Sequence, residues 1–326
     1  MNKVAQNIKA FHVARSGDPG PLHGAVVAIG NFDGVHRGHR AVIGAALSRA
    51  RGLSRKAAAL TFSPHPRLFL RPQDALFQLS SERDKMRLLA TTGLDGALIM
   101  TFDAELASTS AEDFIEKILV GRFGIGGAAI GFDFHFGQKR AGSPTFLAEQ
   151  GHRLGFAVDI VAPLEDEGRP VSSGAVRAAL AKGRVVEATE LLGAPWFVSG
   201  EVIHGEKRGR ELGFPTANVR LDPSCGLKHG IYAVRVAIGD MRYEGVASFG
   251  VRPMFDNGAP LLEVFLFDFD GDLYGQTVDV AFIGWIRPEQ KFSTIDALKR
   301  HMMADVSQAR DALKRSDKAF PLLGEI

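Results

Sequence analysis

The stretch AVVAIGNFDGVHRGHR (residues 25–40) passes from a run of small apolar residues into a glycine-rich loop that carries two histidines. The apolar run predicts a buried strand that ends near Gly30, and a helix is predicted to begin by about Gly38. The loop between them would then lie at the carboxyl edge of a parallel sheet, where open α/β folds bind their ligands. This one turn therefore predicts both a fold and the position of a site.

The first half of the chain continues in the same rhythm. Apolar runs recur at residues 57–62, 96–102, 127–132 and 157–163, and segments with helical spacing lie between them. Within residues 108–119, Ser110 can cap the first turn of a helix whose apolar side chains face inward. This alternation predicts a parallel sheet with crossover helices.

Near Pro195 the apolar period changes from about 3.6 residues to about two. Strand-like segments separated by Gly, Pro and Asp predict an antiparallel barrel or sandwich, and Asp270-Gly271 is a hairpin signal. A helix from about Thr294 to Ser316 closes the chain, and the two halves meet between residues 183 and 195. The strand-like segments are residues 196–205, 230–239, 241–250, 261–270 and 276–286.

The chain length fits a folded protein with two domains, since 326 residues exceed the roughly 150 residues of one ordinary domain. Thirty-nine Lys and Arg balance 37 Asp and Glu, so no global basic field predicts a nucleic acid partner. The absence of an apolar run of about 18 residues, or of a signal-peptide core, predicts no membrane partner. The single Cys225 cannot form an internal disulfide, and we expect a cytoplasmic location.

The loop of residues 30–38 has the chemistry of a phosphate site. Backbone amides at a helix start attract phosphate, and Gly34 and Gly38 allow it to approach the backbone. His36 and His39 are spaced i, i+3, so both rings can address one ligand from the same side. A glycine-rich turn with surface histidines, or a metal site, would share these features.

GNFDGVHRGH resembles the HxGH signature of the nucleotidylyltransferases, in the form found in bacterial bifunctional riboflavin kinase/FMN adenylyltransferases (FAD synthetases). LTFSPHP (60–66), GFDFHFG (131–137) and VSSGAVR (171–177) resemble later motifs of that family in the same order. The resemblance implies that His36 and His39 contact ATP phosphates and that Arg177 assists them, whereas Gly174 replaces a usual threonine. It also places ATP and FMN against Gly30, Asn31, Phe32, Asp33, Gly34, Gly38, His65, Asp133, Ser172 and Ser173.

A second candidate site lies in GEVIHGEKRGRELGFPTANV (200–219), where glycines alternate with Lys207, Arg208 and Arg210. Glycines with fixed cations suit a cover over phosphates, and the oxygens of Thr216 and Asn218 suit Mg²⁺. From these residues alone, a basic hairpin loop followed by an ordinary turn is the favoured interpretation.

GRELGFPTANV resembles the riboflavin kinase signature, and GIYAVRV, LEVFLFDFDGDLYG and KFSTIDALKRHMMAD follow in the matching order. The resemblance implies that Thr216 and Asn218 hold Mg²⁺ and ATP, and that Glu263 takes the proton of the riboflavin 5'-hydroxyl. An outward-facing strand glutamate would show the same alternation. Met254 and Phe265 depart from the family pattern. The remaining residues implied to bind ATP or riboflavin are Gly205, Lys207, Arg210, Gly213 and Pro215.

We therefore predict a Rossmann-like nucleotidylyltransferase domain with a parallel sheet (residues 1–187) and an antiparallel β-barrel of riboflavin kinase type with a closing helix (188–326). The chain would convert riboflavin to FMN and ADP, then FMN to FAD and pyrophosphate, each with ATP. Its partners would be these small molecules, and self-association is compatible with the sequence. The alternatives are a monofunctional riboflavin kinase with an impaired adenylyltransferase domain and a non-catalytic flavin-binding regulator.

Overall fold

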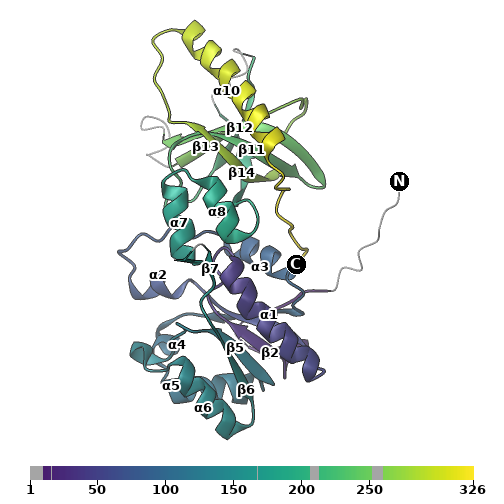
Figure 1. Ribbon diagram of the computed structural model, residues 1–326, viewed down its shortest axis with the longest axis vertical. Coiled ribbons are helices and arrows are strands. Elements are labelled where there is room, and N and C mark those ends of the chain that lie inside the picture. Colours follow the sequence, from purple (N-terminus) through teal and green to yellow (C-terminus); the bar gives the residue numbers. More distant parts are fainter. Residues whose placement is uncertain (1–9, 16, 167, 206–212, 252–259) are drawn as a thin grey trace, which may run out of the picture. The chain divides into compact units, whose positions relative to one another are not determined.

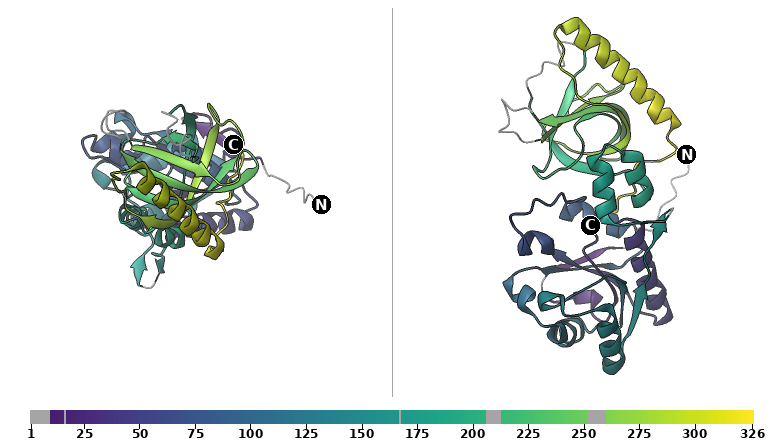
Figure 2. Two further views of the ribbon diagram at one scale, coloured as in Figure 1. Left: turned by 90° about the horizontal axis from the view of Figure 1, so that it is seen from above. Right: turned by 60° about the vertical axis from the view of Figure 1, so that its left-hand side comes forward.

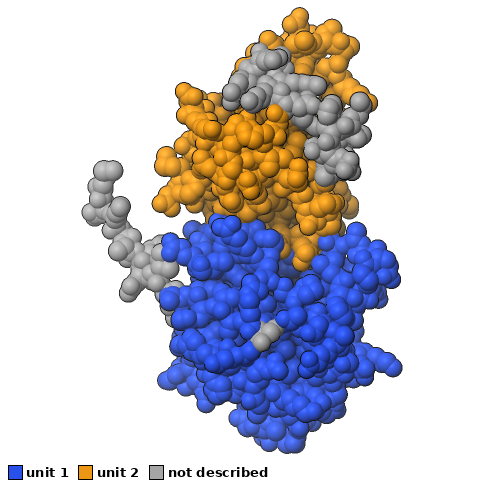
Figure 3. Space-filling view, turned by 180° about the vertical axis from the view of Figure 1, so that it is seen from behind, with its two compact units in different colours: residues 1–76, 81–171, 322–326 blue, residues 77–80, 172–321 orange. Residues whose placement is uncertain are grey.

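A computed structural model describes residues 10–15, 17–166, 168–205, 213–251 and 260–326. The chain divides into two compact units, shown in blue and orange in Figure 3. Unit 1 comprises residues 1–76, 81–171 and 322–326, and unit 2 comprises residues 77–80 and 172–321. The predictions made for Lys207, Arg208, Arg210 and Met254 lie outside the described residues.

Unit 1 is built on a six-stranded parallel sheet in the order β1-β4-β3-β2-β5-β6 (Figure 1). The predicted strands are all confirmed: β2, β3, β4 and β5 lie inside the sheet as nearly continuous apolar segments, and β6 forms one edge. The edge strand β1 was not predicted, since it is short, mostly exposed and has no continuous apolar run. The strands are β1 (His12–Arg15), β2 (Val26–Ile29), β3 (Ala57–Ser63), β4 (Gly96–Thr101), β5 (Gly127–Gly131) and β6 (Ala157–Val161).

Helices cover this sheet. Helix α1 packs against β2, β3, β5 and β6, whereas Val27 and Ile29 of β2 share a core with side chains of η2 and α6. The predicted cap is confirmed, because the Ser110 hydroxyl accepts a hydrogen bond from the Asp113 amide at 3.0 Å. The elements are η1 (Gly20–Leu22), α1 (Arg37–Gly52), α2 (Pro66–Leu70), α3 (Glu82–Ala90), α4 (Ala104–Ser108), α5 (Ala111–Asp113), the π-helical η2 (Phe114–Arg122), η3 (Gln138–Arg140), α6 (Pro144–Leu154) and the short strands β7 (Glu165–Asp166) and β8 (Arg169–Pro170).

Unit 2 is a closed antiparallel barrel in the order β10-β13-β12-β11-β14-β9, seen end-on in the right-hand view of Figure 2. Its interior holds Tyr232, Phe249 and Phe282, each fully buried, and the Tyr232 and Phe282 rings meet edge to face at 5.2 Å. The strands are β9 (Phe197–Ile203), β10 (Thr216–Arg220), β11 (Gly230–Ile238), β12 (Met241–Val251), β13 (Pro260–Leu266) and β14 (Thr277–Arg287), and the helices are α7 (Ser173–Ala181), α8 (Val185–Leu192) and α10 (Ile295–Arg315).

The closing helix α10 confirms the prediction for residues 294–316. Thr294 caps it by accepting a hydrogen bond from the Ala297 amide at 3.2 Å. Arg287 at the end of β14 donates two hydrogen bonds to Asp305 of α10, at 2.7 and 2.6 Å, and both side chains are largely buried. This bidentate ion pair ties α10 to the barrel. Within the described ranges, no helix combines the length and the apolar character needed to cross a bilayer.

Two sequence expectations for unit 2 are corrected. Asp270-Gly271 does not form a tight hairpin, because β13 pairs with β10 and β12 while β14 pairs with β9 and β11. Residues 267–276 instead form a longer loop. The alternative of an ordinary turn at Thr216–Asn218 is also wrong, since these residues begin strand β10.

Candidate active sites in the two units

The loop after β2 in unit 1 is buried and strained. Phe32 and Val35 take positive φ values of 50° and 45°, which is uncommon for residues with a side chain and a true outlier for a β-branched one. Both side chains are 1% exposed. Gly34 takes φ 78°, where a glycine is unstrained. The surrounding packing therefore enforces this backbone shape, a feature that recurs at ligand sites.

His36 and His39 lie at the start of α1, as predicted. Nδ1 of His36 accepts a hydrogen bond from the His39 amide at 3.2 Å and caps the helix. Because Nδ1 accepts, the proton of the neutral ring lies on Nε2, which becomes a donor. The two rings stack with centroids 3.6 Å apart, and His39 also meets the edge of Phe32 at 5.3 Å. The pair thus presents imidazole groups together with the amides of a helix start.

Gly38 leaves little room for a side chain. A Cβ atom at this position would lie 3.0 Å from the Val171 carbonyl oxygen and 3.1 Å from the His36 ring. Gly30 is less constrained, because its Cβ would meet the Phe32 ring at 3.3 Å. The absence of a side chain at residue 38 therefore allows the first turn of α1 to lie close to the His36 ring.

His65 and Asp133 follow strands β3 and β5, the two neighbours of β2 in the sheet. The loops that follow all three strands lie at the same carboxyl edge of the sheet. Nδ1 of His65 accepts from the Arg67 amide at 3.2 Å and caps α2. Asp133 is exposed, and so is the neighbouring Phe132, with a 52% exposed side chain.

Ser172, Ser173 and Arg177 belong to unit 2, at the start of α7. The Ser172 hydroxyl caps the helix by accepting a hydrogen bond from the Ala175 amide at 3.2 Å. The Arg177 guanidinium donates from Nε to the Phe77 carbonyl at 2.5 Å. The expectation that these residues act together with the loop of unit 1 stays a prediction.

The second candidate site lies on the barrel wall. Strand β10 pairs with β13, which sets Asn218 directly opposite Glu263 and Thr216 opposite Phe265. Directly opposite residues point to the same face of a sheet, with Cβ atoms about 5 Å apart. The sheet register therefore brings together the proposed metal ligands and the proposed base, which lie far apart in the sequence.

Asn218 is 6% exposed, and its Oδ1 has no hydrogen-bond partner within the ranges that the structure describes. A buried carbonyl oxygen without a partner is costly, and oxygen atoms of this kind are ligands for Mg²⁺. Gly205, which follows β9, lies against this amide, and a Cβ atom there would be 2.9 Å from the Asn218 Cγ. The donor set at this position thus fits a hard divalent cation.

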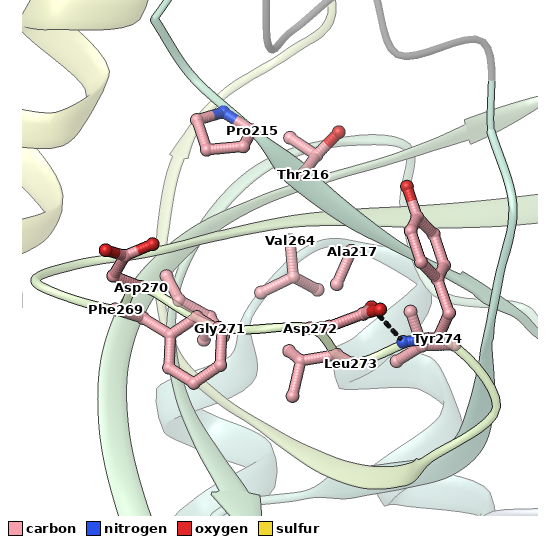
Figure 4. Close-up of a pocket in the computed structure, with 12 residues that line it drawn as sticks. Pro215, Thr216, Ala217, Val264, Phe269, Asp270, Gly271, Asp272, Leu273 and Tyr274 are labelled. Carbon is pink, nitrogen blue, oxygen red and sulfur yellow. Dashed lines mark hydrogen bonds between the residues drawn. The ribbon is translucent and has the colours of Figure 1, made fainter.

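Two cavities flank this part of the barrel, and Thr216 lines both. The first has a volume of about 370 Å³ and is formed by β10, β13 and the loop of residues 267–276 (Figure 4). The second has a volume of about 290 Å³, and it contains Glu263 and Phe265 and extends to α10. Alternation along β13 explains the division, because Val264 faces the first cavity and its two neighbours face the second.

Sequence reasoning missed Glu289, a second carboxylate that lines the cavity containing Glu263. The residue is exposed overall, but its carboxyl lies against the Gly250 backbone. Burial raises the pKa of Glu289, the charge of Glu263 raises it further, and His229 opposes both. No local pattern marks this role, since Glu289 follows a proline in a polar stretch.

It also missed Lys85 of α3, whose ammonium reaches the start of the loop after β2. Nζ donates to the Asn31 carbonyl and to the Thr61 hydroxyl, each at 3.3 Å, and to the Phe62 carbonyl at 3.5 Å. A lysine within a polar helix is ordinarily read as an exposed residue, so the sequence gives no signal for this contact.

Comparisons with known proteins agree with this division of sites. Residues 19–175 match the family model described as FAD synthetase, and residues 192–313 match the one described as riboflavin kinase. The bifunctional riboflavin kinase/FMN adenylyltransferase of Pseudomonas fluorescens is 41% identical, with 94% of this chain and 97% of that protein covered. The Haemophilus influenzae protein of the same name is 40% identical, covering 89% of this chain and 94% of its own.

A solved structure from Streptococcus pneumoniae, titled as a macrolide-efflux protein, superposes with a TM-score of 0.83 at 31% identity. The match covers 92% of this chain and 99% of that one. Fold, sites and matches together define a class of chain in which a nucleotidylyltransferase module is joined to a kinase barrel. This chain belongs to the family of bifunctional riboflavin kinase/FMN adenylyltransferases. The predicted family and fold class are confirmed.

Proposed function

We propose that this chain makes FAD from riboflavin in two ATP-dependent steps at two separate sites. The first step yields FMN and ADP, and the second yields FAD and pyrophosphate. The observation that carries this proposal is the division of chemistry between two folds: His36 and His39 lie in unit 1, whereas Asn218 and Glu263 face each other on the barrel of unit 2. The matches to both family models support both activities.

In the first step, Glu263 accepts the proton of the riboflavin 5'-hydroxyl as that oxygen attacks the γ-phosphorus of ATP. Thr216 lines both cavities, so the phosphoryl group would cross the barrel wall beside it, from ATP in one cavity to riboflavin in the other. Asn218 and Thr216 would hold Mg²⁺, which supplies positive charge to the phosphates when bound. Gly205, Gly213 and Pro215, from the glycine-rich segment expected to cover the ATP phosphates, complete the proposed ATP site.

In the second step, a phosphate oxygen of FMN attacks the α-phosphorus of a second ATP, and pyrophosphate leaves. The amides at the start of α1 and the imidazole donors of His36 and His39 stabilise negative charge on the transferring group. Arg177 adds a guanidinium whose charge is fixed. No covalent enzyme intermediate is needed, because positioning and charge stabilisation supply the catalysis.

The proposal extends to the setting of the enzyme. The adenylyltransferase function would occupy residues 1–187 and the kinase function residues 188–326. Small molecules are its partners, and its place is the cytoplasm, where ATP is available and a lone Cys225 stays reduced.

Incubation of the purified chain with riboflavin and Mg-ATP tests the proposal, with flavins separated by chromatography over time. We expect FMN to appear first and FAD to follow. FMN that accumulates without FAD would support the monofunctional kinase instead, and flavin binding without any product would support the regulator. Both alternatives are disfavoured by the presence of both family matches and of the site residues in each unit.

A further inference from the structure

The Asn31 peptide at the start of the loop after β2 receives two donors. The Lys85 ammonium donates to the Asn31 carbonyl at 3.3 Å, and the Thr61 hydroxyl donates to the same oxygen at 3.2 Å. Lys85 also donates to that hydroxyl and to the Phe62 carbonyl. One side chain from α3 therefore links the end of β2 to the end of β3.

The Lys85 ammonium makes these contacts at a position where burial removes part of its hydration. Burial lowers the pKa of Lys85, while the nearby charges of Asp33 and Glu82 act to raise it. Glu82 is itself held by Arg15, whose Nη2 donates to it at 2.5 Å. A partly buried ammonium needs partners, and Nζ has three protein oxygens within hydrogen-bond distance. These commitments leave Lys85 unsuited to act as a direct phosphate ligand.

The loop that Lys85 contacts requires an external support. Phe32, directly after Asn31, and Val35 both hold positive φ values that a free chain would leave. Such conformations persist only where the surrounding structure enforces them. Asn31 directly precedes this strained turn. Hydrogen bonds that hold its carbonyl therefore restrain the direction in which the backbone leads into the turn.

We propose that Lys85 is a positioning residue for adenylyl transfer: by holding the Asn31 carbonyl, its ammonium keeps the loop of residues 31–36 in the shape that receives the ATP phosphates. The inference rests on the proposed function of this loop. It assigns Lys85 an effect on ATP through His36 and the loop amides, without contact between Lys85 and substrate.

The test compares Lys85→Met with Lys117→Met, which removes an exposed lysine of the same unit. We expect Lys85→Met to raise the KM for ATP in FAD formation and to lower kcat/KM about tenfold or more, since small misplacements near reacting groups have large effects. The KM for FMN and the rate of FMN formation from riboflavin should not change. A purely structural role would lower kcat through loss of active protein and leave the KM for ATP unchanged, which would overturn the proposal.

Amide hydrogen exchange over residues 31–36 gives a second readout that needs no activity. Exchange should be faster in Lys85→Met than in wild type or Lys117→Met, and unchanged exchange would contradict the proposal even if wild type makes no FAD. Should Lys85→Met fail to fold, Thr61→Val removes the other donor to Asn31 and nearly preserves volume. We expect a smaller rise in the KM for ATP with faster exchange of the loop, and no change in either would refute the idea.

Discussion

Replacement of Gly205 by alanine should separate the two activities. The new Cβ atom would lie 2.9 Å from the Asn218 Cγ and 3.3 Å from its Oδ1, and closer still to Nδ2. Asn218 is buried, so its side chain has little space into which it can move. Restoring ordinary contact requires the amide to shift by about 1 Å, and a displacement of that size costs roughly 100-fold in rate. In free energy this is about 2.7 kcal/mol of transition-state stabilisation.

The assay measures kcat/KM for FMN formation from riboflavin and, with the same preparation, FAD formation from FMN. Gly205→Ala should lower the first and spare the second. The matched control is Gly284→Ala in β14, where the Cβ would meet its nearest neighbour at an ordinary 3.5 Å. The assignment of Asn218 is refuted if Gly205→Ala forms FMN as fast as wild type, or if both activities fall together.

Three further outcomes follow from the structure. Gly174→Ala should raise the free energy of unfolding by about 0.5–1 kcal/mol in a urea titration. Residue 174 is helical and exposed, and its new Cβ would meet only the Ser172 hydroxyl, at 3.7 Å. A loss of stability would contradict this expectation. Glu289→Gln should become more stable to heat relative to wild type as the pH rises above 4.5. The pKa of Glu289 is raised in the folded state, so ionisation of this carboxyl above its ordinary pKa destabilises the folded wild type, whereas glutamine does not ionise. A difference in melting temperature that does not change with pH would exclude this effect. Asp305→Ala should lower the free energy of unfolding by about 3–5 kcal/mol, because it leaves the largely buried Arg287 without its carboxylate partner. The control Asp311→Ala, at an exposed position of the same helix, should change it little. Equal effects of the two substitutions would rule out the ion pair as the cause.

The parts of the fold that the sequence predicted are those with strong local signals. The central strands of the sheet are continuous apolar runs, and α10 carries a cap and a helical period. Strand β10 was missed because its start carries the polar residues Thr216 and Asn218, which the sequence also allowed as a turn. Asp270-Gly271 gave a wrong hairpin because strand pairing in a closed barrel is set by distant strands.

In the candidate sites, too, the sequence predicted only those features that local spacing encodes. The spacing of His36 and His39 predicted that the rings act together, and helix geometry brings them into a stack. Lys85 and Glu289 could not be found in this way, because their roles depend on contacts across the tertiary structure. Lys85 lies 54 residues after its carbonyl partner. Their roles follow from burial and from hydrogen bonds, neither of which local sequence encodes.

The central claim is that one chain carries two separate phosphorus-transfer sites. The most direct measurement is a time-resolved flavin analysis with riboflavin and Mg-ATP for wild type, Glu263→Gln and the double variant His36→Ala with His39→Ala. We predict FMN and then FAD for wild type, almost no FMN for Glu263→Gln although added FMN is still adenylylated, and FMN without FAD for the double variant. Loss of FMN in the double variant, failure of Glu263→Gln to adenylylate added FMN, or FMN formation by Glu263→Gln at the wild-type rate would contradict the account.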